Sequence, residues 1–482
     1  MSLSSALNIA QSSLRNTAFQ TGVVSRNVQE AGNPDYSRRA AVLASTAPGA
    51  SVVDVKRAVS EQLFKQNLSA ISAASGQGAF FQGLDRLGLG VNGVDNASSP
   101  AAAIGRLQEA LDLYAATPSN RNLAENALDA ARQVVRSLNE GTTAIQTFRV
   151  EADQAIGRSV DALNGLLSDF KQANDAVKVG TASGRDVSDA LDRRDAILKK
   201  IAEYVPVSTL TRGDNDMVIV TGDGATLFET TPRAVTFSPS TALAAGLDGN
   251  KVYVDGVPLK ASAADGLSGG IAAQLALRDD ATSTMQAQLD EIARGLITAF
   301  AEKDPTAANP DRAGLFTWPG GPAIPAAGTL VNGLAGVIAL NPAMDTAQGG
   351  DATLLRDGGA NGAAYVVNTG GSSYSGLLIA YGERIGATMS FDPQAGISPS
   401  VSLSAYSSNA IGWFENLRQE ASRAAEAKQA LAARTGESLS NETGVNIDEE
   451  MALLLELEHS YQASARIIKA VDEMLAALLA AA

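Results

Sequence analysis

The side chains that could support catalysis or metal binding are few in this chain of 482 residues. His459 is its single histidine and lies in one run with Glu456, Glu458 and Tyr461. One imidazole without a second nitrogen or sulfur ligand makes a poor metal site. A serine–histidine–aspartate triad would have to use the same His459, inside a heptad-patterned run that leaves no open pocket. We therefore predict no catalytic residue, no metal site and a surface or interface role for His459.

Paired carboxylates are the next candidate chemistry, because two of them can flank a glycosidic bond. Asp279–Asp280 and Glu449–Glu450 are such pairs. Solvated helix faces and partners for a helix dipole explain both pairs more simply. A cell-wall hydrolase is thus the weaker alternative, and we predict that the protein is not an enzyme.

Two glycine patterns resemble ligand-binding motifs. The run GLGVNG at 88–93 matches G-x-G-x-x-G, but it follows a predicted helix and leads into a polar, proline-containing segment. A dinucleotide site needs strand, glycine turn and helix in that order, so we interpret 88–93 as a flexible loop. The acidic glycine turns at 222–224, 248–250 and 255–256 lack the calcium-loop spacing and are interpreted as tight hairpin turns. No cofactor is predicted.

Composition excludes several classes of partner. A formal net charge of −15 argues against nucleic acid and against an anionic membrane surface. The chain has no cysteine, which removes disulfides and thiolate chemistry. No apolar run approaches the ~20 residues that span a bilayer, and the N-terminal residues lack the pattern of a signal peptide. We expect no membrane insertion, and export without a cleaved signal peptide if the protein is secreted.

Heptad-patterned runs stand at both ends of the chain. In the C-terminal run, 445–479, Asn446 is positioned as the helix N-cap and Glu449 completes a capping-box variant. Steps of four and three then connect Ile447, Met451, Leu454, Glu458, Tyr461, Ala465, Ile468, Asp472, Leu475 and Leu479. A second apolar row contains Leu453, Leu457, Ile467, Val471, Met474 and Leu478.

The N-terminal run has the same spacing. It comprises Leu3, Leu7, Ala10, Leu14, Thr17, Thr21, Val24 and Val28. It ends at a turn around Pro34 and Tyr36. Pairing of the two runs is one interpretation, and two ordinary surface helices on a globular core is the other.

Between the termini the periodicity changes twice. Residues 57–84 and 101–205 follow a helical period, with a break at 118–120 and a turn at 180–184. Short strands are predicted at 217–220, 226–228, 234–237, 251–254, 315–318 and 329–331. Helical patterns return at 271–300 and from about 375 to a stop at Gly436.

The predicted fold class is mainly α with an inserted β domain, elongated and nested, with paired terminal helices. Residues 1–40 plus 440–482 form the terminal coiled-coil assembly domain. Residues 41–205 plus 265–303 plus 350–439 form a helical-bundle rod domain. Residues 206–264 plus 304–349 form a small antiparallel β domain.

Three segments carry a resemblance to a known family. The run NIDEEMALLLELEHSYQASARIIKAVDEMLAALL at 446–479 closely resembles the closing helix of the flagellar rod–hook axial proteins. SRNVQEAGNPDYSR at 25–38 resembles the end of their N-terminal helix, although Glu30, Gly32, Asn33 and Asp35 depart from the usual residues. ALDRRD at 190–195 shows a weaker similarity. The long helical middle favours a hook-associated member over the shorter rod proteins.

The resemblance implies a structural protein of the bacterial flagellum that self-assembles between hook and filament. It implies a ring of copies, contact with the hook protein and the next junction protein, an export chaperone, and an extracellular location reached by type III export. The terminal helices would form the assembly interface, and we assign to it Leu3, Leu7, Leu14, Val24, Val28, Pro34, Tyr36, Met451, Leu454, Tyr461, Ile468, Val471 and Leu475. A secreted helical adhesin or effector, or another rod or hook subunit, is the alternative.

Overall fold

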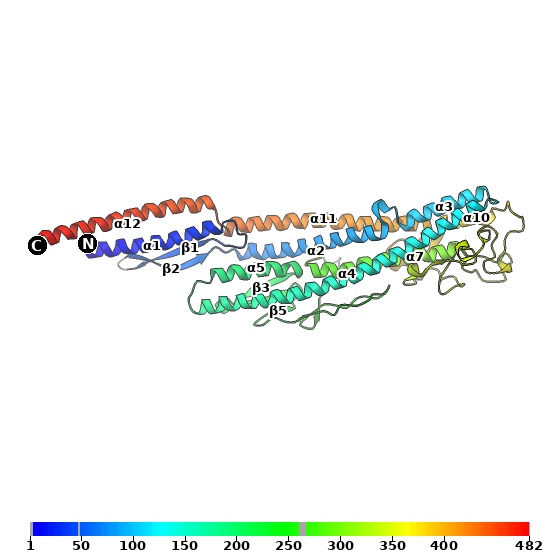
Figure 1. The fold of residues 1–482 in the computed structure, drawn as a ribbon. Helices are drawn as coiled ribbons and strands as arrows, with labels where there is room; N and C mark the ends of the chain where they lie inside the picture. Colours follow the sequence, from blue (N-terminus) through cyan, green and yellow to red (C-terminus); the bar gives the residue numbers. More distant parts are fainter. Residues whose placement is uncertain (1–2, 47–48, 260–266, 482) are drawn as a thin grey trace.

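The chain folds into a long, narrow molecule with both termini at one end (Figure 1). This computed structural model describes residues 3–46, 49–259 and 267–481. Two terminal helices run side by side at the end that carries the termini, and a loop-rich region forms the opposite end (Figure 1). Among the described helices none has an apolar stretch that could cross a bilayer. The predicted mainly helical, elongated fold with small antiparallel sheets is confirmed.

Helices form most of the length of the molecule. The long ones are α1 (Leu3–Glu30), α2 (Glu61–Asn92), α3 (Pro100–Ala116), α4 (Arg121–Ala182), α5 (Ser188–Tyr204), α7 (Thr282–Ala299), α11 (Leu403–Thr443) and α12 (Ile447–Ala481). The short ones are α6 (Gly270–Ala276), α8 (Leu334–Val337), α9 (Leu354–Asp357) and α10 (Gly376–Gly386). At 62 residues α4 alone extends about 90 Å, since each helical residue rises 1.5 Å. Helices α1 and α12 pack together, as do α2 and α11.

The strands are short and pair only with near neighbours in the sequence. One hairpin joins β1 (Arg39–Thr46) to β2 (Gly49–Arg57). Three-stranded sheets contain β3 (Val207–Thr211), β4 (Met217–Thr221) and β5 (Thr226–Phe228), and then β6 (Val235–Thr236), β7 (Tyr253–Val254) and β8 (Val257–Pro258). Two-stranded pairs are β9 (Phe316–Thr317) with β10 (Ala339–Leu340), and β11 (Thr388–Ser390) with β12 (Ser400–Ser402).

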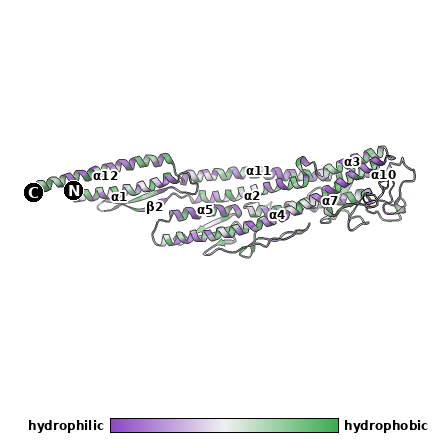
Figure 2. Ribbon diagram, in the orientation of Figure 1, coloured by the Kyte–Doolittle hydropathy of each residue, from purple (hydrophilic) through white to green (hydrophobic). Residues whose placement is uncertain are grey.

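Two apolar cores lie one after the other along the rod. The core nearer the terminal helices joins the second half of α4 to α5 and to the sheets β3–β5 and β6–β7. The other joins α2, α3 and the first half of α4 to α7, α10 and α11. Polar and apolar residues alternate along the helices, and the C-terminal end of α12 is markedly apolar although no other element covers it (Figure 2).

Several predicted strands and turns need correction. Residues 329–331 form irregular chain, not a strand, where the amide of Leu330 donates to Asp392. Asp248–Asn250 is irregular as well, and not a tight turn. A Cβ at Gly249 would lie 2.3 Å from the Arg278 guanidinium carbon, so this glycine permits close approach of the segment around it to the Arg278 side chain. The Asp255–Gly256 turn is confirmed, with φ of 50° and 80° at its two residues.

Several predicted helices also differ from the prediction. The GLGVNG run is not a loop, because α2 continues to Asn92 and only Gly93 leaves the helical conformation. The helical pattern from 375 is interrupted by the β11–β12 hairpin, and α11 passes through Gly436 to end at Thr443. The helix predicted at 271–300 contains a π-helical segment, Leu277–Ala281. Gly436 stays helical because it lies against α2, near the side chain of Asn67.

Candidate assembly surface and hinge

The contact between α1 and α12 is a narrow seam of small and polar residues. Its α12 side has one buried residue every seven positions, namely Glu450, Leu457, Ser464 and Val471. Its α1 side has Ala10, Thr17 and Val24 with the same spacing. The hydroxyls of Ser13 and Ser464 lie 2.8 Å apart across the seam. A large apolar side chain contributes roughly 1.5–3 kcal/mol when buried, so a seam with so few of them holds the two helices together weakly.

The rest of the apolar surface of α12 faces outward. Its exposed large side chains are Ile447, Met451, Leu455, Tyr461, Ile467, Met474, Leu475, Leu478 and Leu479. Helix α1 adds exposed Ile9 and Phe19. Scattered exposed apolar residues are normal on a soluble protein, whereas a run of this length along one helix indicates an interaction surface.

The residues assigned to an assembly interface thus divide into two groups. Val24 and Val471 are buried in the seam, and Leu3, Leu7, Leu14, Val28, Leu454 and Ile468 are partly buried on α1 and α12. Met451, Tyr461 and Leu475 are 44%, 49% and 39% exposed and point away from the seam. Two of the four buried positions of α12, Leu457 and Val471, belong to the second apolar row, and none belongs to the first. The other two, Glu450 and Ser464, lie outside both rows.

A turn at residues 31–38 connects α1 to the β1–β2 hairpin and is the candidate hinge. Pro34 is exposed, whereas Tyr36 is only 7% exposed and donates its hydroxyl to Asn27 Oδ1 at 2.8 Å. Burial raises the pKa of Tyr36 above its usual value. The amide of Arg38 donates to the Thr443 carbonyl at 2.8 Å, which ties the turn to the last residue of α11.

Glu450 connects α12 to the same turn. It is completely buried and accepts from Arg38 Nε at 2.6 Å and from Asn27 Nδ2 at 3.0 Å. Asn27 also donates to the Arg39 carbonyl and accepts from the Arg39 amide. The predicted cap at Asn446 is confirmed, since its Oδ1 accepts from the Asp448 amide at 3.0 Å. The start of α12 is therefore fixed by a cap and by a buried carboxylate.

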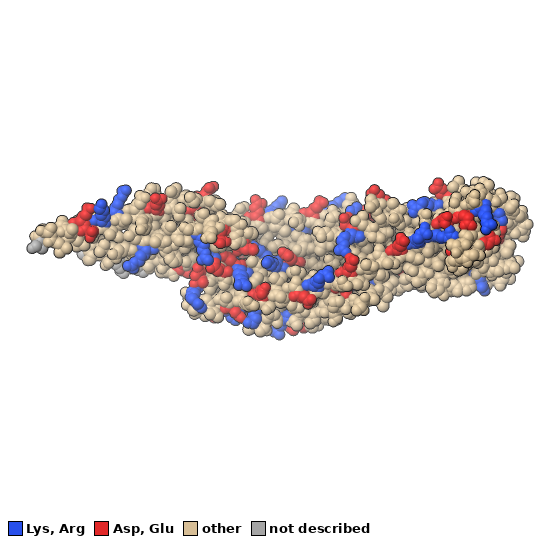
Figure 3. Space-filling model, viewed as in Figure 1, with Lys and Arg blue, Asp and Glu red and all other residues tan. Residues whose placement is uncertain are grey.

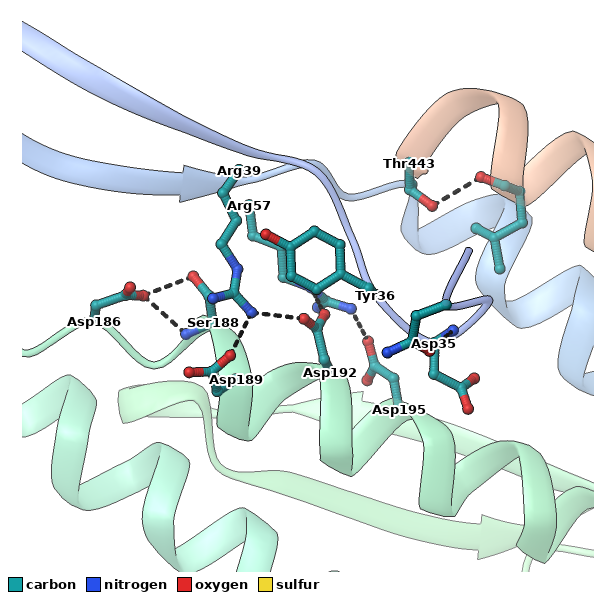
Figure 4. A network of polar contacts seen from close by, with 12 residues as sticks. Asp35, Tyr36, Arg39, Arg57, Asp186, Ser188, Asp189, Asp192, Asp195 and Thr443 are labelled. Carbon is teal, nitrogen blue, oxygen red and sulfur yellow. Dashed lines mark hydrogen bonds and ion pairs between the residues drawn. The ribbon is translucent and has the colours of Figure 1, made fainter. Parts of the chain in front are cut away.

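Below the turn, two arginines of the hairpin meet three aspartates of α5 (Figure 4). Arg39 donates to Asp189 at 2.6 Å and to Asp192 at 2.9 Å. Arg57 donates to Asp192 at 2.7 Å and to Asp195 at 2.6 Å. We call these five residues the arginine–aspartate ladder. Asp192 lies at its centre and binds both arginines.

Local structure explains why these five residues meet. Arg39 and Arg57 are direct partners in the antiparallel register of β1 and β2. Residues three apart lie on one face of a helix, so Asp189, Asp192 and Asp195 project from α5 together. The Tyr36 ring covers the top of the ladder, with its centroid 4.7 Å from the Arg39 guanidinium carbon.

The aspartates of the ladder differ in electrostatic environment. Burial raises the pKa of Asp192, and the attraction of Arg57 and Arg39 offsets this effect only in part. Burial also acts on Asp189, but hydrogen bonds and attraction from Arg39 and Arg26 prevail and lower its pKa. Carboxylates gather on the molecular surface in this region, where the terminal helices meet α5 (Figure 3).

A cavity of about 580 Å³ opens beside the hinge. Its wall combines the turn 31–37 with the start of α2, the second half of β3, one face of α5 and the end of α11. Arg57 and Asp195 of the ladder line it, together with Arg194, Lys199 and Met217. Within the described residues no group of three or more histidine, cysteine, aspartate or glutamate side chains could hold a metal ion. His459 is exposed on α12.

Comparisons with known proteins agree with this architecture. Residues 94–307 match the model of the flagellar hook-associated protein FlgK helical domain. Residues 440–481 match the model of the flagellar basal body rod FlgEFG protein C-terminal region. The chain belongs to the flagellar hook-associated protein FlgK family. This is a family of structural flagellar proteins and not of enzymes, as the sequence predicted.

Individual FlgK-family relatives are distant in sequence. Flagellar hook-associated protein 1 of Escherichia coli (strain K12) is 24% identical over 262 residues, which cover 50% of this chain and 46% of that protein. The Salmonella typhimurium protein of the same name is 25% identical over 264 residues, or 50% of this chain and 45% of its own length. The matched region is thus about half the length of these relatives.

A solved structure extends the similarity over more of the fold. The flagellar hook junction protein FlgK from Burkholderia pseudomallei superposes with a TM-score of 0.59 at 12% identity. The alignment covers 78% of this chain and 99% of that one. The FlgK fold is therefore retained although few residues are shared.

The sequence identified one part of this site and missed another. Asp192 and Asp195 were singled out only as part of the ALDRRD similarity, and their partners Arg39 and Arg57 were not recognised. Aspartates spaced by three on one helix face, with an arginine at each end of the segment 39–57, are the signal that could have paired them.

Proposed function

We propose that this protein is a structural subunit of the junction between flagellar hook and filament, and that its terminal helices assemble with those of neighbouring copies. The observation that carries the proposal is the outward apolar face of α12, in a chain of the FlgK family. A helix pair held by a weak seam, with most of its large apolar side chains exposed, gains most of its stability from further copies.

The proposal assigns a role to each of the three predicted domains. Residues 1–40 plus 440–482 act as the assembly domain, 41–205 plus 265–303 plus 350–439 as the rod domain, and 206–264 plus 304–349 as the surface β domain. Leu3, Leu7, Leu14, Val24 and Val28 of α1 keep the pair together, with Leu454, Ile468 and Val471 of α12. Met451, Tyr461 and Leu475 contact neighbouring copies in a ring, while Pro34 and Tyr36 set the angle between the two domains.

The remaining partners belong to the same proposal. The hook protein lies on one side of the ring and the next junction protein on the other, and an export chaperone keeps the apolar face covered before assembly. The protein acts outside the cell, and it is exported by the flagellar type III apparatus. The absence of cysteine and the strongly negative charge support an extracellular protein that does not bind nucleic acid.

The test replaces outward apolar residues by glutamine in a bacterium whose own copy is deleted. The variant Met451→Gln, Tyr461→Gln, Leu475→Gln should leave the melting temperature of the isolated protein within a degree or two, because these side chains are already exposed in the monomer. Filament attachment and the amount of protein in purified flagella should fall at least about tenfold, as expected when apolar interface residues are lost.

A matched control carries three glutamines at apolar residues exposed elsewhere. Leu113→Gln, Leu210→Gln, Val257→Gln removes side chains that are 55%, 66% and 53% exposed. This control should assemble normally. Normal filament attachment by the α12 variant would refute the assembly role of this face.

A further inference from the structure

Arg194 is a buried cation with no carboxylate in direct contact, although Asp195 and Asp216 attract it from a longer distance. It is 4% exposed, and its Nη1 donates to Asn174 Oδ1 at 3.1 Å and to the Asn215 carbonyl at 2.6 Å. Its Nε is buried and has no hydrogen-bond partner. Burial lowers the pKa of Arg194, because desolvation destabilises the charged form. In the described chain no ion pair includes this guanidinium.

Such an arrangement is unfavourable in a finished structure. Buried charges in proteins are normally paired, since desolvation of an ion costs several kcal/mol and neutral acceptors offset only part of it. A carboxylate is the group that a guanidinium binds best, through parallel N–H···O bonds. The guanidinium of Arg194 therefore has no carboxylate in contact, and an acidic group that reaches it through the cavity would complete its coordination.

The position of Arg194 tells where that group would enter. Arg194 lines the cavity of about 580 Å³ beside the hinge. The other cations of its wall already have carboxylates nearby: Arg57 binds Asp195 at 2.6 Å and Lys199 binds Asp35 at 2.8 Å, while Lys65 lies 3.9 Å from Glu61. Phe64, Met217 and Leu439 add apolar surface to the wall.

We propose that this cavity binds an aspartate or glutamate side chain of a second copy of the chain, with Arg194 as its ion-pair partner. The proposal rests on self-assembly as the proposed function and names a second contact within it. Ion pairing to Arg194 would fix the register of neighbouring copies. A charged contact specifies one register better than the apolar face of α12 does.

Two observations favour a second copy as the occupant. Val445 lines the cavity, and the exposed apolar face of α12 begins two residues later at Ile447, which is 52% exposed. A copy that covers this face is thereby brought to the mouth of the cavity. The chain also carries 52 acidic residues against 37 basic ones, so every copy presents carboxylates in excess.

The first experiment measures whether assembly closes the cavity. The chain has no cysteine, so a single introduced thiol is unique. Thr211 lines the cavity, and its neighbour Leu210 on strand β3 is 66% exposed and does not. Thr211→Cys and Leu210→Cys should both react with a maleimide in the isolated protein. In purified flagella the thiol at 211 should react at least about tenfold more slowly, whereas the thiol at 210 should react as before.

The identity of the occupant is tested at the rim. Val59 lines the cavity and is 60% exposed. A photo-cross-linker attached to Val59→Cys in assembled flagella should yield a product of two copies, at twice 49.4 kDa. Cross-linking to a chain of any other mass would overturn the proposal, as would equal reactivity of positions 210 and 211 in flagella.

The role of Arg194 is tested by Arg194→Met beside Arg193→Met, its exposed neighbour. Asn174 Oδ1 keeps the Met217 amide as a partner, so the first variant leaves no unsatisfied acceptor there and should melt within a few degrees of the unmodified protein. Its amount in flagella should fall about tenfold, and Arg193→Met should be neutral. A large loss of thermal stability in Arg194→Met with normal incorporation into flagella would show that Arg194 only stabilises the fold, and would overturn the proposal.

The outcomes separate the two proposals. Absence of the unmodified protein from flagella would refute the proposed function itself. Presence of the protein in flagella with an open, reactive cavity would refute only the inference drawn from Arg194.

Discussion

Asp192 holds the β1–β2 hairpin, which follows the terminal helix α1, against helix α5. It is the only aspartate of the arginine–aspartate ladder that binds both Arg39 and Arg57, at 2.9 and 2.7 Å. Its side chain is 11% exposed, and the side chains of Arg39 and Arg57 are 3% and 12% exposed. Asp192→Asn keeps the shape of the side chain and removes its charge, so it isolates the electrostatic contribution.

The size of the effect follows from these contacts. A hydrogen bond to a charged group contributes about 1.5–3 kcal/mol, so two of them set an upper limit of about 6 kcal/mol. Each arginine keeps one other carboxylate, Asp189 or Asp195, and burial of the Asp192 carboxylate is itself unfavourable. We therefore expect a loss of about 3 kcal/mol, or about a hundredfold in the population of the opened hinge.

Hydrogen exchange of the full-length protein measures this loss locally. Amides of the β1–β2 hairpin near Arg39 and Arg57 should exchange about a hundredfold faster in Asp192→Asn. Amides near Ala50 should change less, because Ser12 and Asn16 of α1 bind the Ala50 carbonyl at 2.5 and 2.6 Å. Amides of α7, in the distant core, should be unaffected.

Asp189→Asn is the matched control on the same helix. Asp189 also binds Arg39, but its side chain is 67% exposed, so its loss should cost about 1 kcal/mol or less. Equal effects of the two substitutions would refute the reasoning from burial. A uniform rise in exchange that includes α7 would show that the ladder stabilises the whole fold and not the hinge.

Two further predictions concern the distant core and the turn. Burial raises the pKa of Asp290 from 3.8 to about 6, so the folded state binds this proton more tightly than the unfolded state. The stability gained from this proton is largely present at about pH 4 and is lost as the pH rises through 6. Chemical unfolding should show the wild type gaining roughly 2.5 kcal/mol relative to Asp290→Asn between pH 7 and pH 4, and a constant difference would contradict the shift. Pro34→Ala should reduce assembly into flagella more than thermal stability, because Pro34 is exposed and only restricts the turn; equal losses of both would argue against a hinge.

Local sequence signals predicted the elements well wherever neighbouring residues decide the structure. Asn446 caps α12, the break at 118–120 separates α3 from α4, and Asp255–Gly256 joins β7 to β8. Each of these depends on side-chain-to-backbone bonds or on backbone conformations within a few residues. The heptad spacing of both termini likewise predicted helices and the pairing of α1 with α12.

Contacts between distant segments decided the features that the sequence misplaced. Gly249 reads as a turn residue but lies against Arg278, and Gly436 reads as a helix end but remains inside α11 beside α2. A glycine is compatible with a turn, a helix end or a close approach of two segments of the chain. Which of these it adopts depends on the residues that pack against it.

The sequence by itself determined that this protein has amphipathic terminal helices and a long helical rod, because periodicity is a property of short windows. Only the tertiary structure decided which stripe of α12 is buried, because two apolar rows are equivalent until Glu450 meets Arg38 and Asn27. The same holds for the ladder and for Arg194. Charges far apart in the sequence are paired or left unpaired only once the hairpin lies on α5.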